Sequence, residues 1–298
     1  MAPAVKMPGR LPGLRAVFVA AALLSGLVGT LLLRETAEEQ GWEPELSPSA
    51  RRILLASGAS FEAVTGRAAV AQAPERTLAA QLADAADFAA AEAVRRLGLS
   101  SLTAPLRVIL VPSAGAWEEW SFAEGFRGDS LAIHLNGEIL LKGDASDAAC
   151  IDRIAHETVH WAISAAYGNR VPLWLDEGLA GYWGKLIARS YFTARGIRAA
   201  VMVPALSDEK WEPLDLLTAR TNLPADSESA KVFYRASVEL VRAIEDRIGT
   251  HRMPDFIRAV AGGRDWRQAL EEFSHGAPPR PVDLEREVRL ALQQAHTW

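Results

Sequence analysis

The sequence predicts an α+β protein in which a small mixed β-sheet is followed by a mostly helical C-terminal part, with an apolar N-terminal helix ahead of both. Three observations predict this class. Short apolar runs rich in β-branched residues lie between residues 105 and 142 and are separated by turn residues. From residue 147 onward the apolar residues recur at helical spacing. Close to the N-terminus stands an uncharged run long enough for a membrane span.

Residues 16–33 read AVFVAAALLSGLVGTLLL and contain no charge. As a helix with about 1.5 Å rise per residue, this segment nearly crosses a bilayer core of roughly 30 Å. Basic residues dominate before it and acidic residues after it, so the positive-inside rule predicts a cytoplasmic N-terminus, residues 1–15. We therefore expect a single-pass membrane protein with its body extracytoplasmic. The alternative is a signal peptide whose cleavage leaves a secreted protein, but leucines occupy the place of the small residues that cleavage needs.

A polar linker is expected over residues 34–48, a folded domain over 49–275 and a tail helix within 276–298. The first clear helix of the domain runs from Glu75 to Leu97 and is closed by Gly98.

Strands are expected next. One covers residues 105–111 and stops at Pro112. Two more, over 130–135 and 138–142, are joined by Asn136 and Gly137, a pair that favours a tight hairpin turn.

Helices then dominate the prediction. One spans Asp147 to Tyr167 and is followed by the stop signals Gly168 and Asn169. Another begins near Trp174 and ends near Ile187. Further helices are expected over 230–248, 253–261, 266–273 and 283–294, while 117–129 and 206–226 are expected to be loops.

Charge and cysteine content exclude some functions. The net charge of -5 and the pI of about 5.8, without a basic patch interleaved with aromatic residues, argue against a nucleic-acid partner. The single cysteine, Cys150, excludes an intramolecular disulfide and a zinc site built from several thiolates. Cys150 itself is expected to be a buried packing residue, so any metal must be held by histidine and carboxylate side chains.

Residues 156–160 read His-Glu-Thr-Val-His. On a helix, His156 and His160 lie one turn apart on the same face, so both imidazoles can reach one metal ion. Zinc takes neutral imidazole nitrogen as a ligand. Glu157 points beside such a metal rather than at it, which suits a general base acting on metal-bound water. Two unrelated histidines on a solvated helix face are the simpler alternative, against which the apolar neighbours of the motif argue.

A second segment, Val171 to Trp183, reads VPLWLDEGLAGYW and supplies Glu177 as the third metal ligand. The interval between His160 and Glu177 is long enough to end one helix, turn at Gly168 and return with another. Three protein ligands leave a fourth coordination position for water, as in catalytic zinc sites.

The two segments, His-Glu-x-x-His and Trp-Leu-x-Glu-Gly-x-Ala, resemble the gluzincin zinc metallopeptidases, which include thermolysin-like and aminopeptidase-N-like enzymes. The likeness is nearest to the small peptidase-MA-like proteins and extends over about residues 60–275, where Tyr234, Ser237 and Gly249 also match. It implies a zincin-like fold, a Zn²⁺ cofactor and hydrolysis of peptide bonds in a peptide or protein substrate. A Gly-x-Met-Glu-Asn segment is missing upstream of His156, so the resemblance favours an endopeptidase over an exopeptidase.

Several roles stay open at this level. The family usually adds a Tyr or His donor for the oxyanion, and Tyr234 is the candidate, with core packing as its alternative. Asp176 stands where thermolysin-like enzymes have Asn, and it either orients a histidine or caps its helix. His134 faces either the cleft or the solvent. His251 lies in a loop and is expected to be exposed, and no role is assigned to either histidine.

Two tryptophans flank the metal segments, Trp161 and Trp174, and are expected to wall the site or simply to pack. Two rival functions also remain. The domain could be a catalytically inactive zinc-binding envelope domain that recruits a protein partner, or a membrane-tethered scaffold whose apparent zinc site is accidental.

Overall fold

A five-stranded mixed sheet forms the first part of the fold. The computed structural model describes residues 47–57, 60–102, 106–124, 130–135, 137–143, 147–197, 202–203, 206, 210–274, 280–294 and 296–297. These residues all belong to one of the two units into which the chain divides, Leu46–Trp298. The expected membrane segment, 16–33, and most of the linker lie outside the described residues. Within the described ranges, no helix is both long enough and apolar enough to cross a membrane.

The strand order in the sheet is β1-β2-β3-β5-β4. The central strands β2, β3 and β5 run parallel to one another, whereas β1 and β4 pair antiparallel at the two edges. The expected α+β class with a small mixed sheet is therefore confirmed. The strands are β1 (Glu62–Thr65), β2 (Ala69–Ala73), β3 (Leu106–Val111), β4 (Ala132–Leu135) and β5 (Glu138–Lys142).

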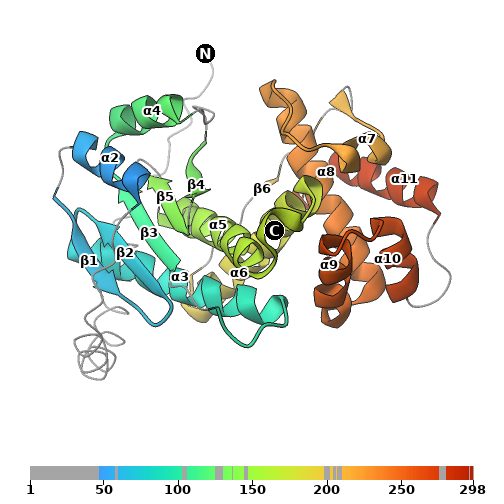
Figure 1. The fold of residues 1–298 in the computed structure, drawn as a ribbon, viewed down its shortest axis with the longest axis horizontal. Helices are drawn as coiled ribbons and strands as arrows, with labels where there is room; N and C mark the ends of the chain where they lie inside the picture. The colour runs from blue at the N-terminus through green and yellow to red at the C-terminus, as the bar shows by residue number, and fades with distance from the viewer. Residues whose placement is uncertain are drawn as a thin grey trace, which may run out of the picture. The chain divides into compact units, whose positions relative to one another are not determined.

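Helices cover both faces of this sheet (Figure 1). Successive residues of β3 point to opposite faces, as strand geometry requires. Val108 packs in the larger core with α3 (Arg76–Arg96) and α5 (Asp147–Tyr167). Ile109 packs in a smaller core with α2 (Pro48–Ser57) and α4 (Ala114–Ala123), where the fully buried Trp117 lies.

The larger core continues into the helical part. Helix α5 packs on α6 (Leu173–Ala194), and α6 packs on α8 (Ser227–Ile248). The remaining elements are the single-turn η2 (Gly168–Arg170) and η4 (Thr250–Arg252), α7 (Leu214–Ala219), α9 (Met253–Ala261), α10 (Trp266–Phe273), α11 (Pro281–Leu292) and the two-residue strands β6 (Met202–Val203) and β7 (His296–Thr297).

Two glycines of α6 allow its neighbours to approach closely. A Cβ built on Gly178 would lie 2.5 Å from the carbonyl oxygen of Ser237 on α8. A Cβ built on Gly184 would lie 2.9 Å from the Cα of His156 on α5. Both distances are far below ordinary van der Waals contact, so only glycine permits this spacing of the three helices.

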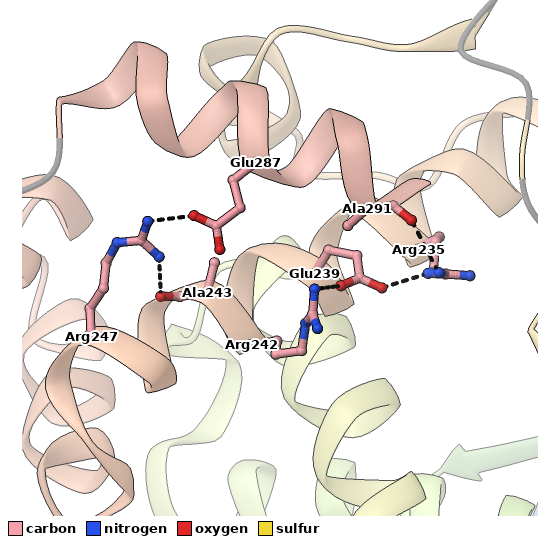
Figure 2. Close-up of polar contacts among 7 residues, drawn as sticks. All are labelled: Arg235, Glu239, Arg242, Ala243, Arg247, Glu287 and Ala291. Carbon is pink, nitrogen blue, oxygen red and sulfur yellow. Dashed lines mark hydrogen bonds and ion pairs between the residues drawn. The ribbon is translucent and has the colours of Figure 1, made fainter. Parts of the chain in front are cut away.

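A layer of charged side chains joins α11 to α8 (Figure 2). The side chain of Glu239 is fully buried and lies between two arginines, Arg235 at 2.8 Å and Arg242 at 2.7 Å. Farther along the same helices, Arg247 pairs with Glu287 at 2.5 Å and donates to the carbonyl of Ala243 at 2.6 Å. Because Leu284, Val288 and Leu292 are buried in the larger core, α11 is an integral part of the helical part of the fold.

Most of the expected elements are present. The hairpin turn contains Gly137 with φ +81°, and α5 and the two helices over 253–261 and 266–273 have the expected bounds. The expected loops over 117–129 and 206–226 were wrong in part, because α4 extends into the first segment and α7 lies within the second. Strands β1 and β2 and helix α4 were not anticipated. Cys150 is buried, as expected of a packing residue.

Candidate metal centre

The two histidines of the motif lie side by side on α5, as the spacing predicts. Their Nε2 atoms are 3.1 Å apart, and the ring planes are 73° apart with centroids 4.8 Å from each other. Two Nε2 atoms that face each other at this distance cannot both carry a proton. The pair is therefore arranged to share a proton or to place two nitrogen lone pairs around one ion.

Glu177 approaches the same point from α6. The chain reverses between the helices through Gly168, whose φ of +61° favours glycine, and through η2. One carboxylate oxygen of Glu177 lies 3.4 Å from Nε2 of His160 and 3.8 Å from Nε2 of His156. Three possible metal-ligand atoms, one from each residue, thus lie within 4.8 Å of one another.

These distances fit the geometry of a zinc site. With metal-ligand bonds of 2.0 to 2.1 Å and tetrahedral angles, ligand atoms are about 3.3 Å apart. The three distances among His156, His160 and Glu177 are 3.1, 3.4 and 3.8 Å, so a small adjustment would seat such an ion. The donor set of two imidazoles and one carboxylate is also one that zinc accepts.

Asp176 supports this assignment by fixing the tautomer of one ligand. Its Oδ2 lies 3.0 Å from Nδ1 of His160, so the imidazole donates its Nδ1 proton to the carboxylate and turns its Nε2 lone pair toward the other ligands. Helix α6 has Pro172 as its N-cap residue, and Asp176 stands inside the first turn. Of the two roles considered for Asp176, the structure favours orientation of the histidine over capping.

The buried environment shifts the pKa values of three neighbouring groups, His156, Glu157 and His160. Burial lowers the pKa of His156 to about 4. Burial acts in the same direction on His160, but the carboxylates of Asp176 and Glu177 outweigh it and raise the pKa well above 6.5. Burial raises the pKa of Glu157 to about 7 although His160 and the backbone amide of His134 favour its ionised form. The two carboxylates that attract a proton to His160 would equally attract a divalent cation.

A cavity of about 1020 Å³ opens over this group of residues. Its wall includes His156, Glu157, His160, Asp176 and Glu177. The edge strand β4 and the two residues before it contribute residues 130–134, and α8 contributes residues that include Tyr234. The candidate oxyanion donor and the candidate ligands therefore share one cavity.

The other candidate residues differ in their placement. His134 lines the cavity, with its Nε2 buried, and burial lowers its pKa to about 4. His251 is exposed in η4, as expected. Trp161 and Trp174 are buried and do not line the described cavity, and Trp174 packs edge-on against Trp266 at 5.5 Å. These two tryptophans are core residues in this structure.

Two features of the cavity wall were missed from the sequence. Strand β4 lines the cavity and is the sheet edge, a position that depends on strand order. Arg153 lines it as well. A local signal for Arg153 existed, because it precedes His156 by three positions and so lies on the same face of α5.

Comparisons with known proteins do not add to this picture: no family model matches the chain, and no curated protein matches it.

Proposed function

We propose that this protein is a zinc-dependent peptidase of the gluzincin type that hydrolyses peptide bonds in peptides or proteins. His156, His160 and Glu177 would hold the zinc ion, and Glu157 would serve as the general base. The observation that carries the proposal is the convergence of three ligand atoms from two helices within 4.8 Å of one another. Unrelated histidines and carboxylates on a solvated surface would not be expected to converge beneath a cavity.

Each residue then has a distinct task. When bound, zinc supplies Lewis acidity, which lowers the pKa of water toward about 7 and polarises a carbonyl group. Glu157 takes a proton from the attacking water and passes it to the nitrogen of the leaving amine. Tyr234, which lines the same cavity, is the candidate donor to the oxyanion. Asp176 keeps His160 in the tautomer that leaves Nε2 available.

The edge strand supports an extended peptide as the substrate. The backbone amide of Lys142 donates to the carbonyl of Leu131 at 3.0 Å, so Leu131 turns its carbonyl toward β5. Because backbone groups alternate along an antiparallel strand, Ala132 and His134 turn theirs away from β5, and residues 130–134 line the cavity. The His134 amide already donates to Glu157, so the Ala132 groups and the His134 carbonyl are the ones that a substrate can meet. An extended segment can add to such an edge through main-chain hydrogen bonds, without a sequence requirement of its own.

The direct test is Glu157→Gln. We expect the variant to retain zinc, because Glu157 is not among the ligands, and to lose most hydrolysis of a mixed peptide pool, by at least about 100-fold. Glu119→Gln, the same change at an exposed position on α4, should behave like the unmodified protein.

Hydrolysis that is unchanged in Glu157→Gln would refute the mechanism. Bound zinc without any hydrolysis in the unmodified protein would instead favour the alternative function, an inactive zinc-binding domain that recruits a partner. Attachment to a membrane through residues 16–33, with the domain outside the cytoplasm, stays a separate proposal that fractionation of cells would test.

A further inference from the structure

Arg153 is the feature of the cavity wall that the proposed mechanism does not use. It precedes His156 by three positions and His160 by seven, so all three residues lie on one face of α5, and all three line the cavity. Long side chains on a helix lean toward its N-terminus. This tendency places the expected position of the Arg153 guanidinium on the side of His156 that is away from His160.

The charge of Arg153 has no partner among the residues that the structure describes. Its Nη1 atom is buried without a hydrogen-bond acceptor. The adjacent carboxylate, Asp152, lies 3.7 Å from Lys185 instead. A guanidinium stays protonated in proteins, and a buried N–H group without an acceptor is destabilising, so an acceptor from outside the chain would be stabilising here.

The other cations of the described wall differ from Arg153 in this respect. Each of them has a partner within the protein: Arg170 donates to the carbonyl of Tyr167, Arg220 pairs with Glu212, and Lys231 pairs with Glu228. A ligand that needs a cation in this cavity would therefore meet Arg153 without displacing an existing ion pair.

We propose that Arg153 binds a carboxylate of the peptide substrate and thereby selects peptides that carry a carboxylate close to the cleaved bond. This inference rests on the proposed function and specifies its substrate class. A guanidinium offers two parallel N–H groups to a carboxylate, a geometry that a neutral amide cannot match. Arg153 stands about 4.5 Å before His156 along the helix axis, and an extended peptide advances about 3.3 Å per residue. The substrate carboxylate that meets Arg153 is therefore expected one to three residues from the cleaved bond.

Two sources could supply that carboxylate: an Asp or Glu side chain, or the C-terminal carboxylate of a short peptide. The test uses fluorescein-labelled octapeptides with an alanine background. One series carries Glu or Gln at each position in turn, and a second compares a free C-terminus with its amide. Affinity is measured by fluorescence anisotropy with Glu157→Gln protein, so that binding is read without turnover.

We expect one carboxylate-bearing peptide to bind about tenfold or more tightly than its amide partner. The series in which this occurs identifies the source. Arg153→Gln should reduce the ratio to about one, and Arg153→Lys should keep part of it because the charge remains. Arg189→Gln, the same loss of charge at an exposed position on α6, should keep the full ratio.

Ratios below about twofold in every pair would overturn the inference, and so would a ratio that survives Arg153→Gln. The comparison between paired peptides needs no change at Arg153, so the absence of any preference would overturn the inference even where a variant folds poorly. Hydrolysis of neutral peptides by the unmodified protein reports on the proposed function separately.

Discussion

The contact between α5 and α6 at Gly184, next to the backbone of His156, gives a sharp prediction, namely the effect of Gly184→Ala. The added Cβ would lie 2.9 Å from Cα and 3.0 Å from N of His156. These are backbone atoms of a buried helix and cannot rotate aside. Overpacking of a core costs about 1 to 3 kcal/mol, and contact with backbone places this change at the upper end. Alanine regains about 1 kcal/mol of helix propensity, so we expect a net loss of about 2 kcal/mol in the free energy of unfolding.

Gly115→Ala is the matched control. Gly115 is exposed on α4, and a Cβ there would find its nearest neighbour, Oγ of Ser113, at 3.9 Å. The same chemical change should therefore stabilise the protein by up to about 1 kcal/mol. Urea denaturation followed by circular dichroism measures both variants.

Zinc affinity gives a second readout for the same pair. Glu177 stands two turns before Gly184 on the same face of α6, so a displacement of this helix lengthens the 3.4 and 3.8 Å distances to the histidines. Gly184→Ala should bind zinc more weakly, whereas Gly115→Ala should not. A Gly184→Ala protein as stable as the Gly115→Ala protein would refute the packing argument.

Three further predictions concern polar contacts. Asp176→Asn should weaken zinc binding about 10- to 100-fold in competition with a chelator, because the carboxylate that lies 3.0 Å from Nδ1 of His160 loses its charge. Unchanged zinc affinity would contradict the orienting role of Asp176. Glu245→Ala should lower the free energy of unfolding by about 1 to 3 kcal/mol in urea denaturation. The buried indole N–H of Trp183 would lose its acceptor, the Glu245 carboxylate at 2.7 Å. Glu239→Ala should lower the free energy of unfolding by about 3 to 5 kcal/mol, because the buried charge of Arg235 loses its partner (Figure 2). Glu287→Ala removes a more exposed carboxylate of the same layer and should change the free energy of unfolding by less than about 1 kcal/mol. Equal losses in these last two variants would contradict the difference in burial.

The sequence was most informative where structure is decided locally. Helix α5 has the predicted bounds because its apolar spacing and the glycine at 168 are both local signals. The hairpin between β4 and β5 likewise follows from Gly137, whose positive φ suits the turn. The meeting of the two histidines follows from helix periodicity alone. The approach of Glu177 was inferred from the length of the intervening segment, and the structure brings it to the same point.

The elements that were missed depend on contacts between distant segments. Strand β2 reads AVAQA and is poor in residues that favour strands, so its conformation depends on pairing with β1 and β3. Helix α4 lies in a segment that was expected to be a loop, and its Trp117 and Trp120 are buried in the smaller core. The position of β4 at the sheet edge follows from strand order, which no local pattern specifies.

The metal content of the purified protein tests the central claim most directly. After dialysis against buffer with a limiting concentration of zinc, elemental analysis should find one zinc ion per chain, and His156→Ala and Glu177→Ala should each lose most of it while remaining folded. Zinc well below one equivalent in the unmodified protein, or full retention of zinc in both variants, would contradict the claim that these side chains hold a metal ion.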